Sequence, residues 1–136
     1  MAKILVIRLS AIGDVAMTVP VIYSAAKANP QHTFTVLTQA FLIPVFMNRP
    51  ANVDVIGINT KAAEKTLGGL LRFASALVKY EYDVVLDLHN VIRTMIIRGM
   101  FRIKGKKVYV VDKARKERKR LTEQAAALKA VLYPEP

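Results

Sequence analysis

Short runs of β-branched and other apolar residues alternate along the chain with longer segments of helical periodicity. The runs that predict strands are Ile4–Ile7, Thr33–Leu37, Val53–Ile58, Val84–Leu88 and Lys107–Val111. Strands that alternate with helices are typical of βαβ units around a parallel sheet. The sequence therefore predicts an α/β fold with a Rossmann-like, doubly wound parallel sheet, for which we assume the strand order 3-2-1-4-5.

The first helical segment follows the first strand. Its apolar positions repeat at helical spacing, at Val15, Val19, Ile22 or Tyr23, and Ala26, and the pair Asn29-Pro30 ends it. Pro20 lies deep in this segment, where a proline breaks a helix. We therefore expect the helix to begin near Thr18, with Pro20 in its first turn and 14–17 as a loop or a separate helical turn.

Three further helical segments are predicted. Residues 40–47 indicate a short helix interrupted by Pro44, and residues 64–80 a longer one. The longer helix is expected to face the sheet with Leu67, Leu70 or Leu71, Ala74, and Leu77 or Val78. In the third, residues 91–103, the expected core side is Val91, Met95, Ile96 and Met100, with Arg93, Arg98 and Arg102 elsewhere.

The last part of the chain differs in composition. Residues 112–120 are almost wholly charged, and apolar residues then follow at helical spacing, at Leu121, Ala125, Leu128 and Leu132. We expect a folded domain over residues 1–111, followed by a basic linker and an amphipathic C-terminal helix over residues 112–136.

Composition narrows the class of protein. With 136 residues and 53% hydrophobic content, the chain is the size of one domain with its own core. The net charge of +11 implies an anionic partner such as a phosphorylated substrate, nucleic acid or an acidic membrane surface. The chain has no cysteine and only two histidines, His32 and His89, so no metal site is predicted. Without a signal peptide or a membrane span, we expect a cytoplasmic protein.

Polar residues follow the first and the fourth predicted strands. Arg8, Ser10, Gly13 and Asp14 come after the first, and Asp87, His89, Asn90 and Arg93 after the fourth. In the assumed order these strands are neighbours at the point where the winding reverses, and ligands bind beyond their carboxyl ends. We therefore expect the two groups to share one cleft, with candidate bases and an anion clamp.

Each candidate also has a structural alternative. Asp14 is a candidate general base or a helix-capping residue, and Gly13 could only supply an unusual backbone angle. Asp87 could bond loop amides rather than substrate, and Arg93 could be a solvated helix residue. A single glycine in the first turn does not match a dinucleotide fingerprint or a P-loop, so no nucleotide cofactor is predicted.

The basic run Lys113–Arg120 is the other candidate for binding anions. Nucleic acid or an anionic membrane surface would suit it. It contains no aromatic residue for base stacking, and the chain has no helix-turn-helix or zinc-finger spacing. A solvated linker is the favoured interpretation, and nucleic acid is not the expected partner.

Two motifs resemble a known family. Residues 7–20 read IRLSAIGDVAMTVP and residues 82–94 read YDVVLDLHNVIRT. In their order, spacing and pattern they resemble the heptosyltransferases of lipopolysaccharide core synthesis, glycosyltransferase family 9. The resemblance implies the N-terminal half of a GT-B fold, in which one domain binds the acceptor and the C-terminal domain binds the nucleotide sugar. This chain corresponds to the first domain only.

The resemblance also implies roles for individual residues. Asp14 would be the general base of an inverting sugar transfer from ADP-heptose, and Ser10 and Gly13 would shape its loop. Asn90 and Arg93, with basic residues around them, would hold a phosphorylated acceptor made of lipid and sugar. Because this acceptor carries a lipid, the resemblance also implies peripheral contact with the inner membrane. Without the donor-binding half we expect the chain to bind acceptor at most. The alternative is a non-catalytic α/β module that binds anions or nucleic acid.

Overall fold

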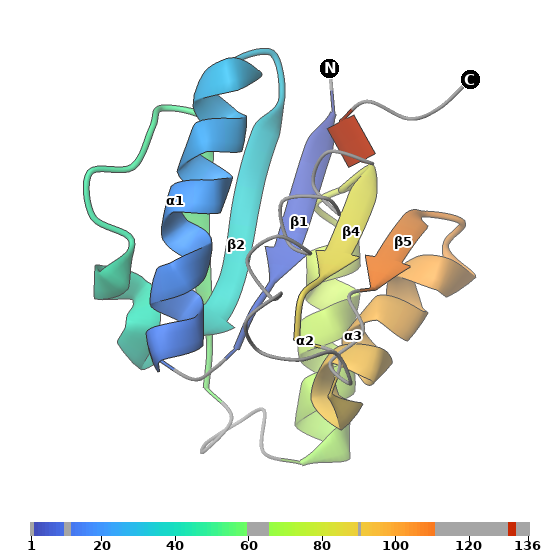
Figure 1. Ribbon diagram of the computed structural model, residues 1–136. Coiled ribbons are helices and arrows are strands. Elements are labelled where there is room, and N and C mark those ends of the chain that lie inside the picture. Colours follow the sequence, from blue (N-terminus) through green and yellow to red (C-terminus); the bar gives the residue numbers. More distant parts are fainter. Residues whose placement is uncertain (1, 10–11, 60–65, 90, 111–130, 133–136) are drawn as a thin grey trace.

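The computed structural model describes residues 2–9, 12–59, 66–89, 91–110 and 131–132. Within them, five parallel strands form one sheet in the order β3-β2-β1-β4-β5 (Figure 1). The strands are β1 (Lys3–Ile7), β2 (Thr33–Gln39), β3 (Val53–Ile58), β4 (Val84–Asp87) and β5 (Lys107–Val110). The α/β class and the assumed strand order are confirmed, so β1 and β4 are neighbours where the winding reverses.

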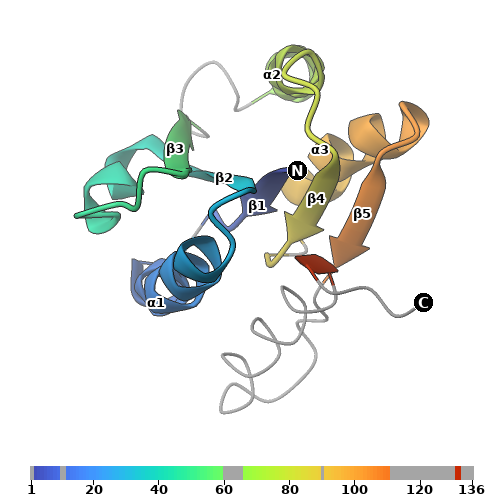
Figure 2. The same cartoon turned by 90° about the horizontal axis from the view of Figure 1, so that it is seen from above.

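The helices cover both faces of the sheet (Figure 2). One face carries α1 (Ile12–Ala28) and the 3₁₀ helix η1 (Ala40–Val45), and the other carries α2 (Leu67–Val78) and α3 (Ile92–Ile103). Alternate side chains of each strand therefore enter different cores. In β1, Ile4 and Val6 pack on the α1 side, while Leu5 and Ile7 pack on the α2 and α3 side.

Helix α1 begins six residues earlier than the expected start at Thr18. The prediction was wrong because Pro20 lies inside the helix rather than in its first turn. A proline cannot donate to the carbonyl four residues before it, here that of Ala16. Both Ala16 and Pro20 are exposed, so water can solvate that carbonyl. The opposite side of α1 is buried at Val15, Thr18, Ile22 and Ala26, and this packing holds the helix together.

Helix α3 is rotated relative to the expected face, which is only partly buried. Ile96 and Met100 pack against the core as expected, but the fully buried residues are Thr94, Ile97 and Phe101, and Met95 is 47% exposed. Two contacts set this rotation. Thr94 Oγ1 accepts from the backbone N–H of Val91 and donates to its carbonyl, and Arg98 turns toward the sheet to pair with an acidic residue of β4.

Helix α2 buries Leu70, Ala74 and Leu77, as expected, but Leu67 is exposed. Figure 1 shows the first turn of α2, which begins at Leu67, beyond the carboxyl ends of the strands. The Thr66 side chain caps this turn by accepting from the N–H of Gly69.

The expected short helix after β2 is present as η1, with Pro44 inside it. Gly57 of β3 allows η1 to approach closely, because a Cβ atom there would lie 2.7 Å from the Cα atom of Ala40. The predicted basic linker, and the C-terminal helix apart from Val131 and Leu132, lie outside the described residues. Those two side chains pack against the core on the α1 side.

Candidate functional site

Arg8 connects three elements at the carboxyl edge of the sheet. Its backbone N–H donates to the carbonyl of Leu37 in β2 at 3.0 Å. Its Nη1 atom donates to the carbonyl of Leu88 at 2.7 Å, and its Nη2 atom lies 2.9 Å from Oδ2 of Asp14 in α1. The Arg8 side chain therefore holds Asp14 in a fixed position above the ends of β1 and β4.

The side chains of β1 point alternately to the two faces of the sheet, and this explains the arrangement. Ile4 and Val6 face α1, so Arg8, two residues further on, continues on the same side. Asp14 lies in the first turn of α1, where the helix dipole favours a negative charge. The Asp14 side chain is 25% exposed and the Arg8 side chain only 3%. The carboxylate is thus partly exposed, while the guanidinium that holds it is buried.

Asp87 belongs to a second cluster. Its carboxylate is fully buried. Oδ1 accepts from the backbone N–H of His89 at 2.9 Å, and Oδ2 lies 2.9 Å from Nη1 of Arg98. Asp87 therefore fixes the turn after β4 and ties it to α3, which is the structural alternative that the sequence left open.

The structure brings the two groups to one edge of the sheet but not to one face. Arg8 and Asp14 lie on the α1 side, whereas Asp87 follows Val85 onto the α2 and α3 side. The bond from Arg8 to the Leu88 carbonyl joins the two groups.

Two other predicted site residues are described. Arg93 is exposed in the first turn of α3, and the His89 side chain is buried. Ser10 and Asn90 lie outside the described residues. The structure therefore places Arg93 and Asp14 on different helices, α3 and α1.

Gly13 leaves space beside Asp14. Apart from its chain neighbours and the backbone of α1, no described atom lies within 4 Å of the position that its Cβ would take. Among the described residues the positive φ angles fall elsewhere, so Gly13 has ordinary helical backbone. Since glycine costs a helix about 1 kcal/mol relative to alanine, neither backbone conformation nor packing within the described chain explains it. The space suits a group that approaches α1 from outside.

The sequence does not indicate two features of this edge. Arg98 is expected elsewhere than on the apolar side of α3, and no local pattern shows that Asp87 is its partner. Thr38, one residue beyond the Ile7–Leu37 pair, is fully buried, and its hydroxyl has no hydrogen-bond partner among the described residues. A single threonine near the end of an apolar strand gives no sequence signal of its own.

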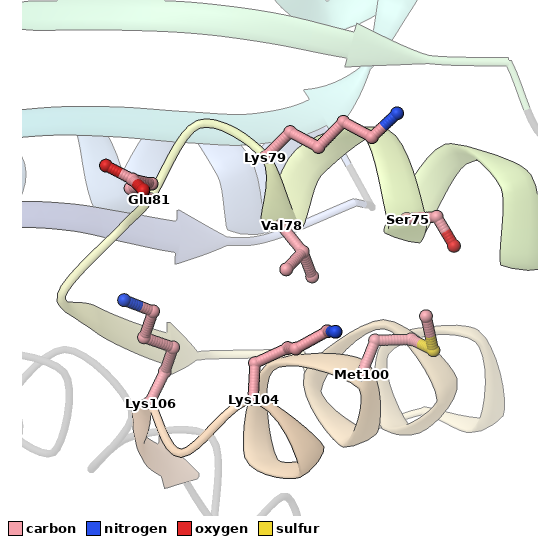
Figure 3. A pocket seen from close by; sticks show the side chains of 7 residues that line it. All are labelled: Ser75, Val78, Lys79, Glu81, Met100, Lys104 and Lys106. Atoms are coloured by element: carbon pink, nitrogen blue, oxygen red, sulfur yellow. The ribbon is translucent and has the colours of Figure 1, made fainter.

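A separate hollow lies away from this site, between the C-terminal parts of α2 and α3 (Figure 3). Its volume is about 510 Å³. The lining residues are Ser75, Val78, Lys79, Glu81, Met100, Lys104 and Lys106. In the part of the chain that the structure describes, no group of three acidic or histidine side chains could hold a metal ion.

No protein-family model and no curated protein matches the chain. Solved structures do. A glycosyltransferase family 9 protein from Veillonella parvula matches with a TM-score of 0.77 and 23% identity, over 96% of this chain and 41% of that one. The E. coli heptosyltransferase WaaC with ADP matches with a TM-score of 0.70 and 19% identity, over 98% of this chain and 48% of that one. The E. coli ADP-heptose lipopolysaccharide heptosyltransferase II matches with a TM-score of 0.68 and 19% identity, over 93% of this chain and 40% of that one.

These matches establish the class of fold, a Rossmann-like α/β domain of the kind found in GT-B glycosyltransferases. The chain spans less than half the length of each of these three structures. A putative UDP-N-acetylglucosamine 2-epimerase from Listeria monocytogenes has a similar domain, with a TM-score of 0.61 and 14% identity. The fold therefore serves more than one reaction, and the function must be argued from the site.

Proposed function

We propose that this chain is the acceptor-side domain of an inverting, metal-independent glycosyltransferase that transfers heptose or a related sugar to lipopolysaccharide core. The observation that carries the proposal is the Asp14 carboxylate, which a buried arginine holds at the carboxyl edge beside the open space at Gly13. Its place in the IRLSAIGDVAMTVP motif, and the heptosyltransferases among the matching structures, support the choice of reaction.

In this mechanism Asp14 is the general base. Its carboxylate takes the proton from an acceptor hydroxyl. The hydroxyl oxygen then forms a bond to the anomeric carbon of the sugar. The bond from that carbon to the nucleotide diphosphate breaks, the diphosphate leaves with the electron pair, and the configuration inverts. Arg8 is a positioning residue, because its contact with Oδ2 fixes the orientation of the carboxylate.

The acceptor is expected to carry phosphate groups. Arg93 is exposed at the start of α3, where a guanidinium can bind phosphate through two parallel hydrogen bonds. We assign acceptor contact also to Ser10, Gly13, His89 and Asn90. Asp87 acts through the turn that it holds, since its oxygens bond His89 and Arg98.

The donor is expected to bind to a second domain. Structures of E. coli WaaC contain ADP and ADP-2-deoxy-2-fluoro heptose, and this chain covers about half of each. A nucleotide sugar such as ADP-heptose would therefore bind mainly outside this chain. Alone, the chain is expected to bind acceptor without transferring a sugar.

The test is a transfer assay on the two-domain protein that contains this chain, with ADP-heptose and a phosphorylated core acceptor. Asp14→Asn keeps the size of the side chain and its contact with Arg8 but removes the base, so kcat should fall by about 10²- to 10⁴-fold. Asp54→Asn is the matched control. It makes the same change at an exposed carboxylate near the amino end of β3, and transfer should stay at the level of wild type. Undiminished transfer by Asp14→Asn would remove Asp14 from the base role.

A further inference from the structure

The hollow between α2 and α3 lies at the other end of the sheet from Asp14. The first turn of α2 lies beyond the carboxyl ends of the strands (Figure 1), and the 12 residues of the helix advance about 18 Å toward the hollow. Just after the helix, the carbonyl of Tyr80 accepts from Nζ of Lys3, the first residue of β1. The hollow therefore belongs to the amino edge of the sheet. Its volume of about 510 Å³ is typical of a small-molecule site.

Two apolar side chains line the gap between the helices. Val78 of α2 and Met100 of α3 are both half-buried, and both point into this gap (Figure 3). They form a contact surface that an apolar group can cover, which removes both side chains from water. A ligand that fills the hollow therefore has an apolar part.

Positive charge predominates around these two side chains. Lys104 and Lys106 come from the end of α3 and Lys79 from the end of α2, while Glu81 is the one acidic residue among the described lining. None of the three ammonium groups forms an ion pair or a hydrogen bond with a described residue. Three lysines against one glutamate leave an excess of two positive charges.

Capping of the helix ends does not account for these lysines. Lysine near a helix C-terminus often bonds the last carbonyls. In α2 the carbonyls of residues 76–78 accept instead from the backbone N–H groups of residues 79–81, at 3.0–3.2 Å. In α3 those of residues 100–102 accept from the backbone N–H groups of residues 104–106, at 3.0–3.3 Å. The ammonium groups are therefore available to a ligand.

The turn that borders the hollow is anchored to β1. Glu81 has a φ angle of 55°, in the left-handed region that is uncommon for residues other than glycine. On either side of it, Tyr80 accepts from Nζ of Lys3, and Asp83 exchanges two hydrogen bonds of 2.8 Å with the backbone of Lys3. Backbone in this region persists where the surrounding structure enforces it, and it is frequent at binding sites. The rim of the hollow is thus formed before any ligand binds.

We propose that the hollow binds a small organic phosphate monoester. Near pH 7 such a group carries a charge of about −1.5 to −2, which balances the excess of positive charge in the lining. The ammonium groups of Lys104 and Lys106 bind the phosphate as point charges, and the organic part covers Val78 and Met100. Glu81 accepts hydrogen bonds from hydroxyl groups of the ligand. This site is separate from the proposed transfer site and does not depend on its function.

Charge and side-chain type favour this ligand over other anions. Inorganic phosphate would leave Val78 and Met100 uncovered. A triphosphate would bring more negative charge than the lining neutralises, and it would meet the Glu81 carboxylate. Nucleic acid binds through aromatic side chains that stack on its bases, and the described lining holds none.

Pyridoxal 5′-phosphate tests the site, because it combines a ring, a phosphate monoester and an aldehyde. The amine of a lysine beside the bound phosphate adds to the aldehyde, water leaves, and borohydride reduces the resulting imine to a stable secondary amine that mass spectrometry locates. Labelling at Lys104 and Lys106 should exceed labelling at Lys27, an exposed lysine of α1, about ten-fold. Pyridoxal, which has no phosphate, should show no preference. Equal labelling of the three lysines, or the same preference with pyridoxal, would overturn the proposal.

Calorimetric titration with phenyl phosphate measures binding without a covalent bond. Inorganic phosphate should bind about ten-fold more weakly, since it leaves the apolar side chains in water. Lys104→Gln and Lys106→Gln should each weaken the binding of phenyl phosphate about five-fold, whereas Lys27→Gln should not. Circular dichroism establishes that each variant is folded, and Lys104 is exposed, so its replacement leaves the core intact. Equal affinities for the two phosphates, or equal affinities of the Lys104 and Lys27 variants, would contradict the assignment. Neither assay involves sugar transfer, so the result is independent of whether Asp14 is the base.

Discussion

Arg8 and Asp14 form an ion pair of 2.9 Å in which the arginine is almost fully buried and the carboxylate is not. The arginine also donates to the Leu88 carbonyl, so one side chain links the end of β1, the turn after β4 and the first turn of α1. Any ligand that Asp14 contacts is thereby coupled to the position of all three elements. The pair serves the fold and the proposed site together.

Arg8→Lys tests this bridging role. Lysine keeps the charge, but a single ammonium cannot reproduce the fork that contacts Asp14 and Leu88 together. We expect the free energy of unfolding to fall by about 1–3 kcal/mol, since a buried carbonyl loses its donor. Urea unfolding measures the change. The control is Arg72→Lys on exposed α2 surface, which should stay within about 0.5 kcal/mol of wild type. Equal behaviour of the two variants would contradict the bridge.

The Asp87–Arg98 pair offers a second test. Its carboxylate is fully buried, and the Arg98 side chain is 13% exposed. Removing one partner leaves the other charge buried, so Asp87→Asn and Arg98→Gln should each destabilise the protein by about 3 kcal/mol. The double variant should lose less than the sum, with a coupling of about 1–3 kcal/mol. Denaturant titration of all four proteins measures it. Additive losses would show that the pair is not energetically coupled.

The fold was largely predictable from the sequence because its signals are local. Apolar β-branched runs alternate with helical periodicity, and parallel βαβ connections leave few strand orders. The start of α1 was not predictable, because the local rule for proline places Pro20 in a first turn. The exposed Ala16 carbonyl and the long buried side of α1 decide the outcome, and both depend on the tertiary structure.

The site was predictable as an edge of the sheet but not as a set of contacts. Side chains alternate between the two faces of the sheet along β1 and β4. Arg8, and with it Asp14, therefore lies on the α1 side, whereas Asp87 lies on the α2 and α3 side. Arg98 of α3 pairs with Asp87 of β4, and Met95 of the apolar pattern stays exposed. Such a pairing between two elements leaves no mark in a single sequence.

Gly57 and Gly99 should respond oppositely to alanine. A Cβ atom at Gly57 would meet the backbone of Ala40 at 2.7 Å, so Gly57→Ala should cost about 1–3 kcal/mol as η1 is pushed away. At Gly99, a Cβ atom would meet no described atom within 4 Å other than its chain neighbours and the backbone of α3, and alanine should add about 0.5–1 kcal/mol through its helix propensity. Thermal unfolding measures the change in stability of each variant, which should be a loss for Gly57→Ala and a gain for Gly99→Ala. A stabilised Gly57→Ala variant would contradict the close packing of η1 on β3.

Pro20 and Pro30 provide the last comparison. Inside α1, Pro20 leaves the Ala16 carbonyl without its helical donor, so Pro20→Ala should raise the free energy of unfolding by about 2 kcal/mol. Pro30 lies in the turn after α1, where a fixed φ limits the unfolded chain and no helical bond is lost. Pro30→Ala should therefore lower the free energy of unfolding by about 0.4–1 kcal/mol. Urea denaturation measures the free energy of unfolding of both variants, which should change in opposite directions. A loss of stability in Pro20→Ala would show that the helix is not strained at this residue, and that α1 gains more from the rigid proline than from the missing bond.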